Sequence, residues 1–184
     1  MNQFTIISND CWGNSLYKKL NVPYNNPFIG TFICPDQYIN FLEKFPEILK
    51  EKLYFNNNSL IGNLGEVCDI FFLHYSSQQE IKEKWDRRIK RLNFNDCDNF
   101  IYKIWITNVG AYKSCKNYDH INVLERFYKL KFKYKISFTD ENYNYNHPNN
   151  IAINDCNCAI SLWNKSININ LIKDLFKNSS NIIL

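Results

Sequence analysis

The chain has 184 residues, of which 45% are hydrophobic and 16% aromatic, and its formal net charge is +4. This length suits one globular domain over residues 1–184, and the composition excludes a disordered chain. The charge fits an anionic ligand, but basic residues are interleaved with acidic ones, which disfavours a nucleic-acid-binding surface.

The sequence offers no sign of export or membrane insertion. No apolar run approaches the roughly 20 residues that span a bilayer, and the opening MNQFTIISND lacks the basic and apolar regions of a signal peptide. We therefore expect a cytoplasmic protein without a membrane span. Its seven cysteines, an odd number, then indicate reduced thiols, with Cys34 and Cys68 in the core. Cys156 and Cys158 lack the spacing of a zinc knuckle, and no metal site is expected.

Predicted strands and helices alternate along most of the chain. Apolar, β-branched and aromatic runs mark the strands, and apolar residues at helical spacing mark the helices. The predicted strands cover residues 4–7, 28–33, 60–61, 67–75, 99–107 and 134–139, with one or two short strands within 151–163. The predicted helices cover residues 14–20, 35–45, 47–53, 77–92, 119–130 and 168–178. This order predicts a single α/β domain with a mixed, mainly parallel sheet and helices packed on it.

Polar residues follow four of the predicted strands. If these strands run parallel, the polar groups lie along one edge of the sheet, where open α/β sheets usually bind ligands. The groups are Ser8-Asn9-Asp10, His74-Tyr75-Ser76, Thr107-Asn108 and Thr139-Asp140-Glu141. Their position indicates a shared pocket, although polar residues also end strands without any function.

His74 is the candidate general acid or base, because histidine titrates near pH 7 without any shift of its pKa. It follows an apolar run, Ile70–Leu73, so its ring is expected to be partly buried. The alternative is a histidine bonded to the backbone at a strand end. Asp10 is the second candidate catalytic residue, and with Asn9 it would bind substrate hydroxyls. Asn108 is a further candidate for substrate binding.

Arg88 falls on the apolar face of the predicted helix 77–92. Ile81, Trp85 and Ile89 mark that face at helical spacing. A buried guanidinium needs a partner, because its desolvation costs several kcal/mol. The partner is either a structural carboxylate, such as Asp10 or Asp69, or a ligand phosphate or carboxylate, which arginine binds bidentately.

Cys11 and Trp12 begin the turn toward the next helix and complete the set of candidate substrate-binding residues. Trp12 could stack on a sugar or base, or it could fill the core beneath the helix. A helix N-terminus lowers the pKa of a nearby thiol, so Cys11 could be a nucleophile with His74 as its base. The order of these two residues matches no local protease signature.

Several familiar motifs are absent from the sequence. It contains no G-x-G-x-x-G, no Walker A sequence and no G-x-S-x-G, and only five glycines. Dinucleotide enzymes, P-loop ATPases and α/β-hydrolases are therefore disfavoured, and no cofactor is expected.

The sequence resembles a bacterial family of unknown function, domain of unknown function 1919, whose members are associated with exopolysaccharide biosynthesis. The resemblance covers most of the chain to about residue 140, with Asn14 in place of a second glycine. It rests on Asn9–Gly13, Tyr17, Pro23–Gly30, Phe72–Tyr75, Glu83–Arg88 and Lys135–Thr139. It implies a compact α/β domain with a mixed, partly barrel-like sheet and a place in surface-polysaccharide gene clusters, and it supplies no mechanism.

Two functions are consistent with these residues. The first is a cytoplasmic enzyme of capsule or exopolysaccharide biosynthesis that modifies or transfers a sugar. It would act on a small molecule or sugar nucleotide, with His74 as acid or base and Arg88 on an anionic group. The second is a non-catalytic binding or scaffold protein of the same pathway. In that case Asn9, Asp10, His74 and Arg88 would bond to one another and leave no open pocket.

Overall fold

The computed structural model describes residues 4–109, 112–113, 115, 117–143 and 145–180. The helices are α1 (Asn14–Lys19), α2 (Pro35–Glu43), α3 (Gln78–Ile89), α4 (His120–Lys129), α5 (Ala159–Ser166) and α6 (Asn170–Ser180). Short 3₁₀ helices cover Glu47–Lys50 and Phe94–Asn99. The strands are β1 (Ile6–Ser8), β2 (Thr31–Phe32), β3 (Leu53–Phe55), β4 (Ile61–Leu64), β5 (Cys68–Phe72), β6 (Ile101–Ile106), β7 (Tyr134–Thr139) and β8 (Asn150–Ala152).

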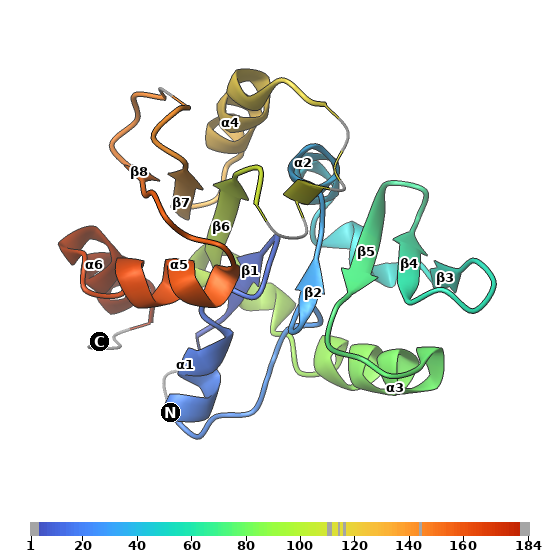
Figure 1. The fold of residues 1–184 in the computed structure, drawn as a ribbon. Coiled ribbons are helices and arrows are strands. Elements are labelled where there is room, and N and C mark those ends of the chain that lie inside the picture. The colour runs from blue at the N-terminus through green and yellow to red at the C-terminus, as the bar shows by residue number, and fades with distance from the viewer. Residues whose placement is uncertain (1–3, 110–111, 114, 116, 144, 181–184) are drawn as a thin grey trace.

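The strands form a parallel sheet and an antiparallel sheet, which lie beside one another in Figure 1. The parallel sheet has the order β1-β6-β7-β8, and Ser8 of β1 pairs with Lys103 of β6. The antiparallel sheet has the order β2-β5-β4-β3, and Thr31 pairs with Phe72. The predicted α/β class with both kinds of pairing is confirmed. The two kinds occupy separate sheets, and neither closes into a barrel over the described strands.

One predicted helix is wrong, and the prediction of one or two short strands within 151–163 is met by one strand. The helix predicted over 47–53 is a 3₁₀ turn over Glu47–Lys50, and Leu53 begins strand β3. The strands predicted within 151–163 reduce to β8, and helix α5 begins at Ala159. The buried positions of α5 fit one helical face, but the apolar run is too short to separate helix from strand by periodicity.

The parallel sheet is buried on both faces. Alternate residues of β6 enter two different cores, with Tyr102 and Ile104 in the core that contains α2 and α4. Ile101 and Trp105 enter the other core, which contains α1, α5 and α6. Helix α2 also contacts β5 and so joins the two sheets. In Figure 1, α5 and α6 flank the parallel sheet, and α3 lies beside the antiparallel sheet.

Cys34 and Cys115 form a disulfide whose Cα atoms lie 5.6 Å apart. The expectation of reduced thiols is therefore wrong for this pair. The two cysteines are 81 residues apart in the sequence, and only the fold brings the segment after β6 against the start of α2. The other cysteines, including Cys68 in the core, are free thiols.

No helix among the described residues is both long enough and apolar enough to cross a bilayer.

Candidate functional site

Two adjoining chambers open where the turn after β1 meets the turn after β5 and the start of α5. The basic chamber has a volume of about 470 Å³, and its walls include Lys18, Tyr24, Tyr75, Lys84 and Arg88. The apolar chamber has a volume of about 210 Å³, and its walls include Phe32, Leu73, Trp105, Val109 and Tyr112. Cys11, His74 and Ile160 line both chambers. A pocket thus lies at the end of β1, with His74 contributed from the turn after β5 of the antiparallel sheet. The polar groups Thr107-Asn108 and Thr139-Asp140-Glu141, which the sequence predicts to share this pocket, line neither chamber.

Arg88 is buried, as the helical pattern predicts, with 6% of its surface exposed. Its Nη1 donates to the backbone oxygen of Ile29 at 3.2 Å and to the hydroxyl of Tyr75 at 2.5 Å. Neither Asp10 nor Asp69 pairs with it, and no described carboxylate lies within ion-pair distance. The guanidinium therefore lines the basic chamber with its positive charge uncompensated by the described residues.

Two tyrosine rings hold the Arg88 guanidinium in place. Its central carbon lies 5.3 Å from the ring centre of Tyr24 and 5.9 Å from that of Tyr75. The Tyr75 hydroxyl also donates to the Ile29 oxygen at 2.6 Å. Burial raises the pKa of Tyr75, which keeps its hydroxyl protonated. The arginine is thus held by neutral groups, and such an arrangement suits an anionic ligand.

Further cationic groups stand around the same chamber. Lys18 is exposed and forms no ion pair with a described residue. Lys84 forms an i,i+4 ion pair with Glu80 on α3. Screening by solvent makes such partly exposed charges weaker than Arg88 as anchors. They still give the chamber a net positive field.

His74 is exposed rather than partly buried, because β5 ends at Phe72 and His74 lies in the turn that follows. Gly30 fixes the position of this turn. Its φ is +77°, and an added Cβ would lie 3.3 Å from the Cβ of His74. The backbone N–H of Leu73 donates to the Gly30 oxygen at 3.0 Å. The imidazole therefore stands at the junction of the two chambers and is open to a ligand.

Cys11 lies at the same junction, but its thiol is not activated. Burial, with a contribution from the nearby Asp10 carboxylate, raises the pKa of Cys11 to about 12. The thiolate is the nucleophilic form, so this environment opposes the nucleophile hypothesis. The Cys11 Sγ lies 3.7 Å from the backbone oxygen of Thr31, and the residue remains a candidate for contact with a ligand.

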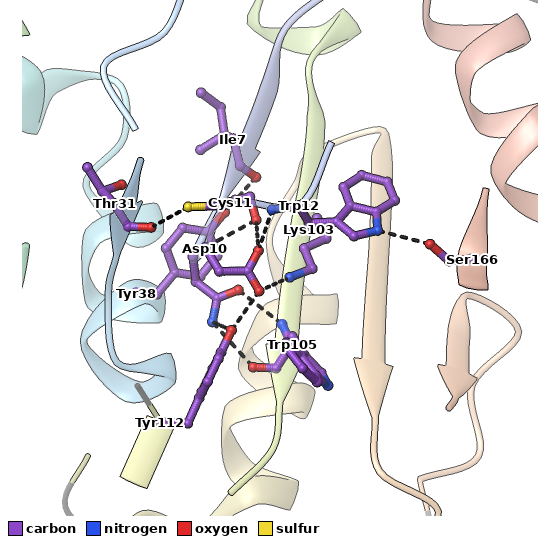
Figure 2. Close-up of polar contacts among 12 residues, drawn as sticks. Ile7, Asp10, Cys11, Trp12, Thr31, Tyr38, Lys103, Trp105, Tyr112 and Ser166 are labelled. Atoms are coloured by element: carbon purple, nitrogen blue, oxygen red, sulfur yellow. Dashed lines mark hydrogen bonds and ion pairs between the residues drawn. The ribbon is translucent and has the colours of Figure 1, made fainter. Parts of the chain in front are cut away.

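Asp10 is held by four donors in the interior behind this junction, as Figure 2 shows in part. Its Oδ2 accepts from Lys103 Nζ at 2.5 Å and from the Tyr112 hydroxyl at 2.8 Å. Its Oδ1 accepts from the Ser8 hydroxyl and from the backbone N–H of Trp12, each at 2.9 Å. The residue as a whole is 4% exposed, and it lines the apolar chamber. These contacts give Asp10 a structural role, because they fix the turn after β1. Its catalytic role stays a prediction.

Lys103 is a fully buried charged residue beside the site that was not predicted from the sequence. It lies on β6 and faces the same core as Trp105. Burial lowers the pKa of Lys103 to about 8, against the opposing effect of Asp10. A signal was available, since a lone lysine interrupts an otherwise apolar strand predicted to be buried on both faces. Such a lysine needs a carboxylate partner.

The other candidates lie away from both chambers. Asn9 is fully buried; it accepts from the backbone N–H of Trp105 at 3.0 Å and donates to its carbonyl at 3.3 Å. Trp12 is also fully buried and donates from its indole to the Ser166 hydroxyl at 3.0 Å, so it fills the core. Asn108 is exposed and lines neither chamber. The structure thus brings Asp10, Cys11, His74 and Arg88 to one double chamber and places Asn9, Trp12 and Asn108 elsewhere.

Comparison with known proteins places the chain among relatives without an assigned reaction. The family model Domain of unknown function (DUF1919) matches residues 1–170. An uncharacterized protein of Haemophilus influenzae is 28% identical over 141 residues, which is 76% of this chain and 63% of that protein. The chain therefore spans less than two thirds of that relative's length.

Proposed function

The chain belongs to the DUF1919 family, and on that premise we propose that it binds a phosphorylated sugar or sugar nucleotide in the basic chamber. The Arg88 guanidinium would hold the phosphate, with Lys18 and Lys84 contributing to the field. His74 would give a proton to, or take one from, the group that reaches the junction of the chambers. This assigns the protein to the sugar-modifying or sugar-transferring enzymes expected for surface-polysaccharide biosynthesis in the cytoplasm.

Arg88 carries this proposal. A buried cation with only neutral partners is costly in the ligand-free protein. A bound phosphate would supply the missing negative charge, and its oxygens match the donor geometry of a guanidinium. The basic chamber also has room for more than a phosphate, since its volume of about 470 Å³ falls within the range of small-molecule sites.

A thermal-shift screen with nucleotide sugars and sugar phosphates tests the binding step. A ligand present at about 100 times its Kd adds roughly 2.7 kcal/mol of stability. We expect Arg88→Gln to weaken binding by about 10- to 150-fold, because a charge-assisted hydrogen bond is worth about 1.5–3 kcal/mol.

Arg87→Gln is the matched control, because Arg87 is the exposed neighbour on the same helix and the change in charge is identical. Equal losses in the two variants, or no shift with any phosphorylated sugar, would contradict the proposed site.

A second experiment separates the enzyme from the non-catalytic binding protein of the same pathway. Two observations favour the binding protein. The oxygens of Asp10 are already engaged and the pKa of Cys11 is raised, so neither group is available to act beside His74 in catalysis. We expect His74→Ala to abolish turnover of a bound nucleotide sugar, followed by chromatography of the products, while binding and the melting temperature stay nearly unchanged. Binding without turnover in the unaltered protein would instead support the binding-protein function.

A further inference from the structure

We infer that the apolar chamber binds a short hydrocarbon chain, alkyl or acyl, carried by the same phosphate-containing ligand. This inference rests on the proposed function, since it takes the phosphate site at Arg88 as its anchor. It specifies the chemical nature of the part of the ligand that lies away from the phosphate.

The walls of the apolar chamber offer hydrocarbon surface. Phe32 and Trp105 supply aromatic surface, and Leu73, Val109 and Ile160 supply aliphatic surface. Leu73 is 48% exposed and Ile160 is 60% exposed, so both present apolar surface at the opening of the chamber. An apolar ligand would cover both.

The buried polar groups of this chamber are already engaged, and its open polar side chains, among them His74 and Asn157, are exposed at its surface. The Asp10 oxygens accept from four donors, among them Lys103 and the Tyr112 hydroxyl. That hydroxyl also accepts from the Asn9 amide at 3.2 Å. The indole N–H of Trp105 has no partner among the described residues, but it is closed off from solvent and so does not face the chamber. A polyol that entered the buried part of the chamber, around Phe32, Trp105 and Tyr112, would lose its hydrogen bonds to water without replacement.

The size of the chamber fits a short chain. An apolar cavity of about 150 Å³ binds benzene, and this chamber has a volume of about 210 Å³. It therefore accommodates a chain of roughly six carbon atoms.

The two chambers meet at Cys11, His74 and Ile160. A ligand that binds its phosphate at Arg88 can therefore extend its chain past this shared wall and into the apolar chamber.

A series of straight-chain alkyl phosphates tests this inference. Inorganic phosphate and ethyl, butyl and hexyl phosphate are titrated by calorimetry into the full chain. Burial of each methylene is expected to tighten binding about fourfold, so butyl phosphate, with two more methylenes, should bind roughly 15-fold more tightly than ethyl phosphate. Glucose 1-phosphate, whose polyol group is similar in size to the hexyl chain, should gain no affinity over ethyl phosphate from the apolar chamber.

Ala159→Phe fills the chamber, since Ala159 lines only the apolar side. It should remove the dependence on chain length while inorganic phosphate binds as before. The matched control is Ala152→Phe at the exposed end of β8, which lines neither chamber. Leu73→Asp, which alters an exposed side chain in the turn after β5, should also remove the gain with chain length.

The outcomes are distinguishable. Phosphate binding without any gain from ethyl to hexyl overturns the inference and leaves the proposed function standing. A gain that persists in both Ala159→Phe and Leu73→Asp also overturns it, because the chain would then lie elsewhere. Failure of every phosphate compound and sugar phosphate to bind overturns the proposed function, and this inference with it.

Discussion

Lys103 Nζ lies 2.5 Å from Asp10 Oδ2, and both side chains are buried between the parallel sheet and the helices that cover it. The pair joins the centre of β6 to the turn after β1, two positions that are 93 residues apart. Burial of an ion pair costs desolvation of both charges, and the additional donors on Asp10 offset part of that cost. The turn that carries Cys11 is thereby fixed to the middle of the sheet.

Removal of one partner of this pair should destabilise the fold strongly. Lys103→Met leaves the Asp10 carboxylate buried without its cation, and we expect a loss of about 3–5 kcal/mol in the free energy of unfolding. The double variant Asp10→Asn/Lys103→Met should lose less than the sum of the single variants, because no uncompensated charge remains. Urea unfolding measures all three. The exposed pair Glu125 and Lys129 is the control, and its removal should change stability by less than about 0.5 kcal/mol.

The sequence predicted the position of Arg88 and missed the partner of Asp10 for a physical reason. Helical periodicity is local, so a face marked by Ile81 and Trp85 is enough to bury Arg88. The pairing of Lys103 with Asp10 depends on which strand lies next to β1, and sequence spacing does not contain that information. The disulfide between Cys34 and Cys115 and the arrival of His74 from the other sheet escape prediction for the same reason.

Thiol counting tests the disulfide. Five of the seven cysteines should react in the unfolded, unreduced protein, and all seven after reduction. Cys115→Ser should lower the free energy of unfolding by about 2–4 kcal/mol, because the bond closes a long loop of the unfolded chain. Cys158→Ser, which alters an exposed free thiol, should have little effect. Seven reactive thiols without reduction would restore the expectation of a fully reduced protein, which suits the cytoplasm.

Cys11 should resist alkylation although it lines both chambers. With its pKa raised to about 12, the thiolate fraction at pH 8 is roughly a thousandth of that of an ordinary cysteine. Iodoacetamide at pH 8, followed by peptide mass spectrometry, should modify the exposed Cys158 rapidly and Cys11 only after unfolding. Rapid modification of Cys11 in the folded protein would revive the nucleophile hypothesis.

The start of α3 should respond to acid through Glu80. Its carboxylate pairs with Lys84 and also accepts from the backbone N–H of Ser76 at 2.8 Å, and these contacts lower its pKa from 4.5 to about 2. The folded state therefore favours the ionised form, and this contribution to stability is present above pH 4.5 and lost as the pH falls toward 2. The melting temperatures of Glu80→Gln and the unaltered protein should differ at pH 7 and converge by pH 2. Glu83→Gln makes the same change in charge on the exposed face of the same helix and is the matched control.

Arg88 offers a test that separates stability from ligand binding. Its replacement by methionine removes two hydrogen bonds, but the Tyr75 hydroxyl still donates to the Ile29 oxygen, so that carbonyl keeps a partner. The same replacement removes a buried charge that has only neutral partners, which is favourable. The two effects oppose each other, and we expect the free energy of unfolding of Arg88→Met to stay within about 1 kcal/mol of the original value. Binding of phosphate compounds should nevertheless be lost, because methionine supplies neither the positive charge nor the hydrogen-bond donors that would hold a phosphate. Urea unfolding and calorimetry on the same preparation give both quantities.

A loss of more than about 3 kcal/mol in the free energy of unfolding, as expected when a structural ion pair is broken, would assign Arg88 to the fold and remove the main support for the anion site.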